Sequence, residues 1–216
     1  MARESKAAAL ARATEVYDLL VDEYPDAHCA LIHRDPFELT VATILSAQCT
    51  DERVNKVTPP LFRRFPSAQS LADADRSEVE ELVRSTGFFR NKAENLVGMA
   101  NALVDRHGGE VPRTMAELRA LPGVGRKTAN VVLGNAFGID EGVVVDTHVR
   151  RISRLLKWTK SENPEIIERD LIKLHPRDRW TMLSHLLIFH GRAVCRARKP
   201  RCEECVLSGH CPSSRV

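Results

Sequence analysis

The sequence predicts an all-α fold, and three observations support this prediction. Apolar residues recur at steps of three and four in several separate stretches, which is the spacing of an amphipathic helix. Residues that commonly cap helices stand just before most of these stretches. Strand signals are almost absent, since only residues 142–145 form a short β-branched run, and this run is too isolated to build a sheet.

The composition is that of a globular protein. The chain has 216 residues, of which 43% are apolar, so it is long enough for one large or two small domains with a proper core. Its formal net charge of +3 is only mildly basic and by itself decides nothing about a nucleic-acid partner. It has no apolar run of about 18 residues, which a membrane span requires, and residues 1–17 lack the apolar centre of a signal peptide. We therefore expect a cytoplasmic protein.

Helices of the first half of the chain are predicted from amphipathic spacing and from capping residues. They are, in order, residues 6–24, 36–45, a helix capped by Thr50 or Asp51, residues 79–83 and residues 90–107. The clearest start is Asp35-Pro36-Phe37-Glu38, which reads as an N-cap, a proline at the first helical position and a glutamate at N3. The pair Pro59-Pro60 must break or bend the third helix, because proline lacks the N–H that a helix interior needs.

Helices of the second half follow from the same signals. They are a short helix capped by Thr114, residues 126–137 ending at Gly138, residues 147–156, a helix that starts at Asn163-Pro164, and residues 180–194. Gly87 and the pair Gly108-Gly109 close the two helices that precede them. The last helix leads directly into a cysteine-rich segment.

A glycine hairpin connects two of these helices. In Leu121-Pro122-Gly123-Val124-Gly125-Arg126-Lys127 the proline and two glycines cannot continue a helix, so they form a turn that opens the helix at Arg126. Without side chains at Gly123 and Gly125, a phosphate can approach the free N–H groups and the positive end of the helix dipole. The same positive end and Arg126 favour the neutral, nucleophilic amine of Lys127.

Four motifs together resemble the endonuclease III family of DNA glycosylases. They are the hairpin segment 121–130, the segment Val145-Asp146-Thr147-His148, the segment Leu45-Ser46-Ala47-Gln48-Cys49-Thr50-Asp51, and the C-x6-C-x2-C-x5-C spacing of Cys195, Cys202, Cys205 and Cys211. Their order and separation match one family member from about Asp35 to Cys211. The hairpin taken alone would also fit a DNA-binding element without enzymatic activity.

The resemblance implies a helix-hairpin-helix glycosylase fold with two domains. A six-helix barrel would span residues 30–138, and the N-terminal residues 1–29 would join the C-terminal residues 139–216 in a helical cluster domain. A cleft between the domains would hold Lys127 on one lip and Asp146 on the other. Clefts of this kind are common substrate sites.

The same resemblance implies a bifunctional DNA glycosylase and AP lyase of base excision repair, which excises oxidised pyrimidines from duplex DNA. Asp146 would stabilise the positive charge that develops on the sugar, although an aspartate at this place also reads as an N-cap. Lys127 would attack the sugar, form a Schiff base and cleave the abasic strand by β-elimination. Adenine-specific relatives have no lysine at this position and do not cut the strand. Alternatives are an AP lyase, a glycosylase for a mismatched pyrimidine or a pyrimidine dimer, and a non-catalytic DNA-binding module.

The DNA contacts implied by the resemblance are spread over three segments. Gln48 would fill the gap left by the extruded base, unless it is only a capping or loop residue. Phe88 would be an apolar wedge, unless it is an ordinary core residue. The remaining candidates are Gly123, Gly125 and Arg126 of the hairpin and Arg198, Lys199 and Arg201 of the cysteine loop. The expected partner is double-stranded DNA with damaged bases or abasic sites, bound by a monomer associated with a bacterial-type nucleoid.

The four C-terminal cysteines are predicted to bind metal rather than to form disulfides, because they gather at one end of a cytoplasmic chain. Thiolates suit zinc as well as iron, but structural zinc sites usually pair two C-x2-C units. The resemblance implies a [4Fe–4S] cluster on Cys195, Cys202, Cys205 and Cys211. His148, His185 and His190 lack metal-ligand partners at suitable spacing, and Cys29 and Cys49 are expected to be small buried residues.

Overall fold

The computed structural model describes residues 4–216, and these contain helices but no strand. The first three residues of the predicted N-terminal segment lie outside the described residues. The chain forms two compact units: one runs from Cys29 to Ile139, and the other joins the residues up to His28 with Asp140–Val216. None of the described helices is long and apolar enough to cross a membrane. The predicted all-α fold is confirmed.

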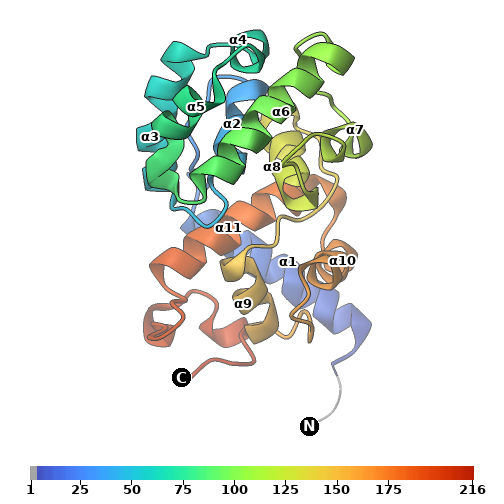
Figure 1. The fold of residues 1–216 in the computed structure, drawn as a ribbon. Helices are drawn as coiled ribbons and strands as arrows, with labels where there is room; N and C mark the ends of the chain where they lie inside the picture. The colour runs from blue at the N-terminus through green and yellow to red at the C-terminus, as the bar shows by residue number, and fades with distance from the viewer. Residues whose placement is uncertain (1–3) are drawn as a thin grey trace. The chain divides into compact units, whose positions relative to one another are not determined.

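The unit Cys29–Ile139 is built around a single apolar core. Its helices are α2 (Pro36–Leu45), α3 (Asp51–Arg64), α4 (Ala68–Ala72), α5 (Arg76–Val83), the 3₁₀ turn η1 (Arg84–Thr86), α6 (Phe89–His107), α7 (Met115–Arg119) and α8 (Arg126–Phe137). The long helix α6 packs against α4 and α5, while α2 packs against α8 (Figure 1). α2 is buried along nearly its whole length. It therefore forms the centre of this unit.

The prolines of α3 do not end the helix, so the break, one of the two outcomes predicted for them, does not occur. α3 continues through Pro59 and Pro60 to Arg64. Each proline removes one backbone hydrogen bond, but apolar side chains on both sides of the pair are buried, among them Val57 and Leu61. Burial of each such side chain stabilises the folded protein by about 1.5–3 kcal/mol, which offsets the loss of the two backbone hydrogen bonds.

The predicted caps are formed by side chains of the expected residues. Asp35 accepts a hydrogen bond from the Glu38 N–H at 2.8 Å, and Thr50, rather than Asp51, caps α3. The Glu38 carboxylate does not close the expected capping box on Asp35, because it accepts the Arg34 N–H at 2.8 Å instead. The short helix α4 was not predicted, although its Ser67 and Ser70 form a reciprocal capping box.

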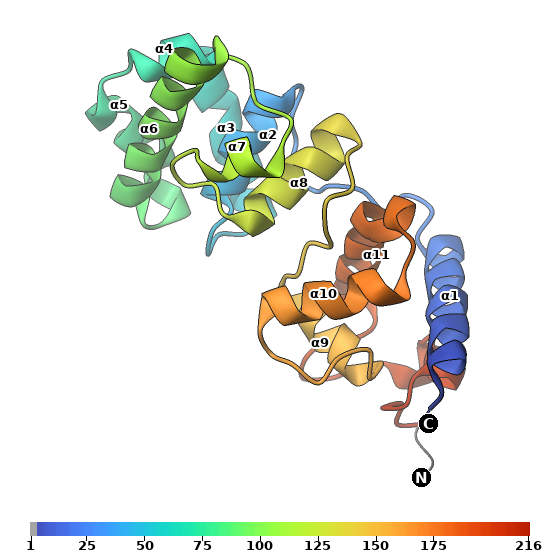
Figure 2. The same cartoon turned by 90° about the vertical axis from the view of Figure 1, so that its right-hand side faces the viewer.

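The second unit contains α1 (Lys6–Glu23), α9 (Thr147–Leu155), α10 (Pro164–Leu174), η2 (Arg177–Arg179), α11 (Trp180–Ala193), η3 (Cys202–Glu204) and η4 (Ser208–His210). α11 packs against both α1 and α9, and α10 packs against the same two helices (Figure 2). The core of this unit includes Leu20 from α1, Ile152 from α9 and Leu187 from α11. Segments from the two ends of the chain therefore share one core.

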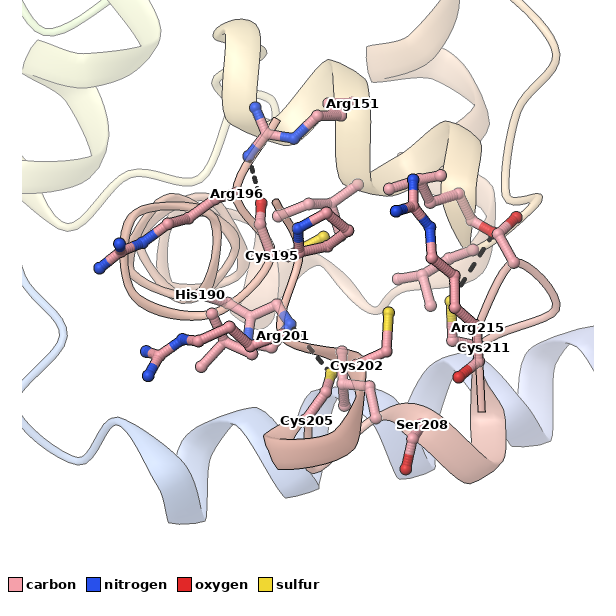
Figure 3. A pocket seen from close by; sticks show the side chains of 18 of the residues that line it. Arg151, His190, Cys195, Arg196, Arg201, Cys202, Cys205, Ser208, Cys211 and Arg215 are labelled. Carbon is pink, nitrogen blue, oxygen red and sulfur yellow. Dashed lines mark hydrogen bonds between the residues drawn. The ribbon is translucent and has the colours of Figure 1, made fainter. Parts of the chain in front are cut away.

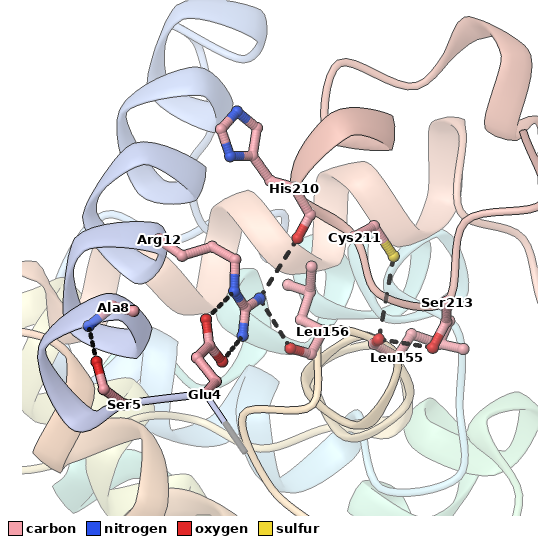
Figure 4. Close-up of polar contacts among 9 residues, drawn as sticks. All are labelled: Glu4, Ser5, Ala8, Arg12, Leu155, Leu156, His210, Cys211 and Ser213. Carbon is pink, nitrogen blue, oxygen red and sulfur yellow. Dashed lines mark hydrogen bonds and ion pairs between the residues drawn. The ribbon is translucent and has the colours of Figure 1, made fainter. Parts of the chain in front are cut away.

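Polar contacts fix the C-terminal segment to α1 and to the end of α9. The Arg12 guanidinium pairs with Glu4 at 2.9 Å and donates to the backbone oxygens of Leu156 at 2.9 Å and His210 at 3.4 Å (Figure 4). The Ser213 hydroxyl donates to the Leu155 oxygen at 2.8 Å. These bonds hold the cysteine-containing loop against two helices.

Candidate active site and cysteine cavity

The glycine hairpin has the geometry of an open anion site. Gly123 has a φ of +74°, and a Cβ there would lie 2.8 Å from the Cβ of Asn95, so only glycine fits. Gly125 is the N-cap of α8, where no side chain makes a capping hydrogen bond, and a Cβ on Gly125 would meet no atom within 4 Å. The first turn of α8 therefore keeps N–H groups without a side-chain cap beside open space, which suits a phosphate oxygen.

Lys127 is the second residue of α8, and its side chain is exposed. The next residues on the buried side of the helix, Ala129 and Val132, belong to the core of the unit. Because α8 is anchored by these core residues, the direction in which Lys127 leaves the helix is fixed. A lysine amine directly beside N–H groups that suit a phosphate is well placed for nucleophilic attack on a group bound there.

Asp146 is the N-cap of α9, in the other unit. Its Oδ1 accepts the N–H groups of His148 and Val149, each at 2.8 Å. Both bonds end on the same oxygen, and no hydrogen bond to Oδ2 is found among the described residues. The carboxylate is half-buried. Capping and a second role are therefore compatible, because one oxygen holds the helix and the other is available to a positive charge.

Gln48 and Phe88, the two residues predicted to enter the DNA stack, share an unusual backbone conformation. Gln48 has a φ of +52° and Phe88 a φ of +49°, and both side chains are exposed. Phe88 is 67% exposed, so the alternative that it is a core residue is wrong, whereas its neighbour Phe89 packs against the core. Left-handed conformations cost side-chain-bearing residues free energy and concentrate at functional sites.

A buried lysine supports the loop that carries Phe88. Lys92 is only 3% exposed, and its ammonium donates to the Thr86 oxygen at 2.8 Å. The Lys92 N–H also donates to the Phe88 oxygen at 3.0 Å. Burial lowers the pKa of Lys92. The burial of Lys92 is not visible in the sequence, because an N-K-A segment within a helix carries no signal that its lysine is buried.

The four C-terminal cysteines line one cavity of about 300 Å³ between the end of α11 and the turns η3 and η4 (Figure 3). None of them forms a disulfide. Within residues 4–216, no three Cys, His, Asp or Glu side chains converge closely enough to hold one metal ion. A single zinc ion would draw its thiolates to about 2.3 Å from one point. Four thiols around a larger space instead fit a multi-atom iron–sulfur cluster.

The surroundings of the cavity suit an anionic group. Arg151, Arg196, Arg201 and Arg215 are among its lining residues. Burial raises the pKa of the Cys195 and Cys205 thiols, so these groups need bound metal to be held as thiolates. The Arg151 guanidinium donates to the Cys195 oxygen at 2.6 Å, a contact that the sequence does not indicate because the two residues lie far apart in it.

His148, His185 and His190 all lie in the unit that contains the four C-terminal cysteines. His190 is buried and lies 3.1 Å from the Tyr24 hydroxyl and 3.5 Å from the Cys205 sulfur. Burial lowers the pKa of His190 to about 4, and that of His185 likewise. Burial also lowers the pKa of His148, whose Nδ1 lies 3.3 Å from Arg151. His190 thus bonds through both ring nitrogens.

The basic residues of the cysteine loop do not share one environment. Arg198 and Lys199 are exposed, and the described residues give neither of them a hydrogen-bond or ion-pair partner. Arg201 pairs with Glu204 at 2.7 Å and donates to the Ala193 oxygen at 2.8 Å. Arg201 therefore contributes to the structure of the loop. Arg126, at the start of α8, is half-buried.

Two protein-family models match this chain, one over most of its length and one over the cysteine loop. Residues 41–177 match the model of the HhH-GPD superfamily base excision DNA repair protein, and residues 195–211 match the iron–sulfur binding domain of endonuclease III. The second match begins at Cys195 and ends at Cys211.

Individual relatives cover nearly the whole chain. Endonuclease III of Synechocystis sp. is 58% identical over 205 residues, which are 95% of this chain and 94% of the relative. Endonuclease III of Escherichia coli strain K12 is 39% identical over 93% of this chain and 95% of its own. A solved non-covalent endonuclease III–DNA complex has a TM-score of 0.90 and 42% identity, covering 95% of this chain and 96% of the solved chain.

Proposed function

We propose a residue-level mechanism for this chain, which belongs to the endonuclease III family of base excision DNA repair proteins. The protein is a DNA glycosylase with AP lyase activity and carries a [4Fe–4S] cluster. The observation that carries the mechanism is the exposed Lys127, directly after a hairpin without a capping side chain.

In the glycosylase step the base leaves the sugar while positive charge builds on the sugar ring. We assign the stabilisation of this charge to Asp146, because its Oδ1 is engaged in capping and its Oδ2 is available. Lys127 then forms the new bond from its Nζ to the sugar carbon that the base leaves. The backbone N–H groups after Gly125 bind a phosphate of the same strand and hold that sugar beside the amine.

In the lyase step the bond between the lysine-bound carbon and the ring oxygen breaks, the oxygen takes up a proton, and the carbon–nitrogen bond becomes an iminium. The iminium acidifies the neighbouring carbon of the opened sugar. Loss of a proton from that carbon breaks the bond to the 3′ phosphate, and the strand is cut by β-elimination. A hydroxyl or carboxylate nucleophile could not form an iminium. Lys127 is therefore the group that joins base excision and strand cleavage in one protein.

Access to the base requires that it leave the stack. Gln48 and Phe88 are assigned to the space that the base vacates, because both are exposed and both are held in left-handed conformations. Rigid presentation matters here, since a side chain that enters a base stack must not fold back onto the protein. Lys92 contributes to this rigidity by binding the Thr86 oxygen.

The cluster is assigned to Cys195, Cys202, Cys205 and Cys211, which line the cavity of about 300 Å³. A cluster bound to these cysteines would cross-link the loop at four positions. The loop residues Arg198 and Lys199 are thereby presented in a fixed place and are assigned to phosphate contacts.

Oxidised pyrimidines are the proposed substrates, and the lysine supports this choice over the strand-preserving, adenine-specific chemistry. A panel of duplexes, each with one lesion, tests it when base release and strand cleavage are measured separately. Activity restricted to abasic sites, or to a mismatched pyrimidine or a pyrimidine dimer, would replace this substrate assignment by the corresponding alternative.

We further propose that the protein is a monomer associated with the nucleoid, because duplex DNA is its substrate. Sedimentation with and without DNA checks the stoichiometry.

The nucleophile is tested by reducing the Schiff base. Borohydride should trap the wild-type protein covalently on a damaged duplex, and Lys127→Gln should give no adduct while still binding DNA. Lys173→Gln, which removes an exposed lysine from the last turn of α10, is the matched control and should trap normally. An undiminished adduct in Lys127→Gln would assign the nucleophile to another amine.

A further inference from the structure

A basic groove of about 930 Å³ runs along α9 in the cluster-containing unit. It is lined by five cationic side chains and a single carboxylate, which are Arg150, Arg151, Arg154, Lys157, Lys160 and Glu162. We call it the α9 groove. It is separate from the glycine hairpin, which belongs to the unit Cys29–Ile139.

The positive charge of the α9 groove is only partly neutralised within the protein. Glu162 pairs with Arg154 at 2.7 Å, and Arg151 is engaged by the backbone oxygens of Gly191 and Cys195. Arg150, Lys157 and Lys160 are exposed, and no acidic partner of theirs is found within residues 4–216. Like charges gathered in a concave surface repel each other, which a bound anion would relieve.

Lys157 has a left-handed backbone conformation, which is unfavourable for a residue with a side chain and indicates a functional role for that side chain. Lys157 has a φ of +55° and follows the last turn of α9, where its N–H donates to the Arg154 oxygen at 3.0 Å. The Trp158 N–H donates to the Ser153 oxygen at 2.9 Å, which completes a helix-terminating motif that favours glycine at this position. A lysine here is strained where glycine would not be.

The same strain occurs at only two other non-glycine residues within 4–216, Gln48 and Phe88. Both are assigned above to insertion into DNA. Lys157 is therefore the third member of a set in which a left-handed backbone presents an exposed side chain. A common purpose for the set is contact with DNA.

We propose that the α9 groove binds the phosphodiester backbone of the DNA on one side of the lesion. The inference rests on the proposed function, which assigns roles to Asp146 and Arg198. The groove includes their chain neighbours, Thr147 next to Asp146 and Ala197 next to Arg198. Between Thr147 and Leu155 the helix rises about 12 Å. At 3.4 Å of duplex axis per nucleotide, this length corresponds to roughly three to four nucleotides of one strand.

A duplex backbone fits the α9 groove better than an acidic peptide does. The three unpaired cations are spread along a helix and the following loop, which matches a regular row of phosphates. The apolar residues that line the groove are Leu155 and Ala197, whereas five of the lining side chains carry positive charge, so its charge favours a polyanionic backbone. Its contribution to DNA binding should be electrostatic and independent of base sequence.

The decisive variant is Lys157→Gly in the cluster-containing protein. Glycine removes the charge and relieves the backbone strain, so the unfolding temperature should rise while the affinity for DNA falls. With a duplex that carries an uncleavable abasic-site analogue, the slope of log affinity against log salt should become smaller by about 0.9, equivalent to one phosphate contact. The affinity at 0.1 M salt should fall roughly fivefold to tenfold. The double variant Arg150→Ala/Lys160→Ala should lower the slope by about 2.

Two controls make the result specific. Lys173→Ala removes an exposed lysine of α10 that does not line the groove, and it should leave both the slope and the affinity at wild-type values. Duplexes shortened stepwise from one end or the other locate the contact. Wild type and Lys157→Gly should bind equally well once the duplex no longer reaches the groove, and this should happen on one side of the lesion only.

An unchanged salt slope in both groove variants would overturn the proposal. If the salt slope of DNA binding is unchanged in both variants, and poly-glutamate binds to the wild type but not to the variants, the groove would instead be assigned to an acidic protein partner. Borohydride trapping of the wild type is run in parallel. If the groove variants lower the salt slope but the wild type gives no adduct, the proposal for the α9 groove is supported and Lys127 is refuted as the nucleophile.

Discussion

Gly191 of α11 lies directly against the imidazole of His148 on α9. A Cβ on Gly191 would be 2.5 Å from Nδ1 and 2.9 Å from Cβ of His148, so any larger residue would force one of the two helices to shift. The His148 N–H is one of the two donors to Asp146 Oδ1, and the Gly191 oxygen accepts a hydrogen bond from Arg151 at 3.1 Å. The close approach of the two helices therefore sets the position of the turn that carries Asp146.

Gly191→Ala should slow base excision about tenfold to a hundredfold, because small displacements of a catalytic group are costly. It should also destabilise the fold by about 1–3 kcal/mol through overpacking. The decrease should be mainly in kcat, since the contact sets the position of the turn that carries Asp146. Adding His148→Ala should restore part of the lost stability, and strictly additive effects of the two changes would show that the contact is not tight.

Asp146→Asn and Asp146→Ala separate the two roles of this residue. Asparagine keeps an oxygen at Oδ1 and is an equally good N-cap, so Asp146→Asn should fold normally and lose most of its excision rate because the charge is gone. Asp146→Ala should lose the rate and also about 1 kcal/mol of stability. Thermal unfolding and single-turnover kinetics measure the two effects. Near-normal excision by Asp146→Asn would reduce Asp146 to a cap.

The helix starts could be predicted because capping is local. Asp35, Thr114 and Asn163 bind N–H groups only two or three residues further along, so the sequence contains both partners. The continuation of α3 through its prolines could not be predicted, because burial of that helix depends on distant segments. The same holds for sites. The Cys-x2-Cys spacing is visible in the sequence, whereas the burial of Lys92 and the left-handed backbone of Lys157 carry no sequence mark.

The cluster assignment predicts about four iron and four sulfide ions per chain in protein purified without oxygen. Cys202→Ser should lower both contents together and weaken DNA binding, because Arg198 and Lys199 lose their fixed positions. The helices of the unit Cys29–Ile139 should keep their far-UV circular dichroism, since their core is separate. Stoichiometric zinc with full DNA affinity in a colourless preparation would contradict the cluster.

Stability should fall in mild acid because of buried histidines. Burial lowers the pKa of His175 to about 4, and its ring packs against Trp158 with no hydrogen-bond partner for Nε2. Between pH 6.5 and 4 the unfolded chain binds the additional proton, so the free energy of unfolding decreases as the pH falls through this window. The shift corresponds to an effect on the order of 1–3 kcal/mol. His175→Phe should flatten the dependence in urea titrations, and an unchanged pH slope would assign the effect to other groups.

The two hairpin glycines should respond differently to the same substitution. Gly123→Ala combines a positive φ with a contact of 2.8 Å to Asn95, so it should destabilise the fold by about 1–3 kcal/mol. Gly125→Ala meets open space and loses only part of a cap, about 0.5–1 kcal/mol, but its methyl group stands where a phosphate is proposed to approach. Gly125→Ala should therefore fold and bind duplex DNA at least tenfold more weakly, as measured by equilibrium titration at fixed salt. If Gly125→Ala binds DNA like the wild type, the phosphate does not approach at this glycine, and the proposed position of the sugar beside Lys127 has to be revised.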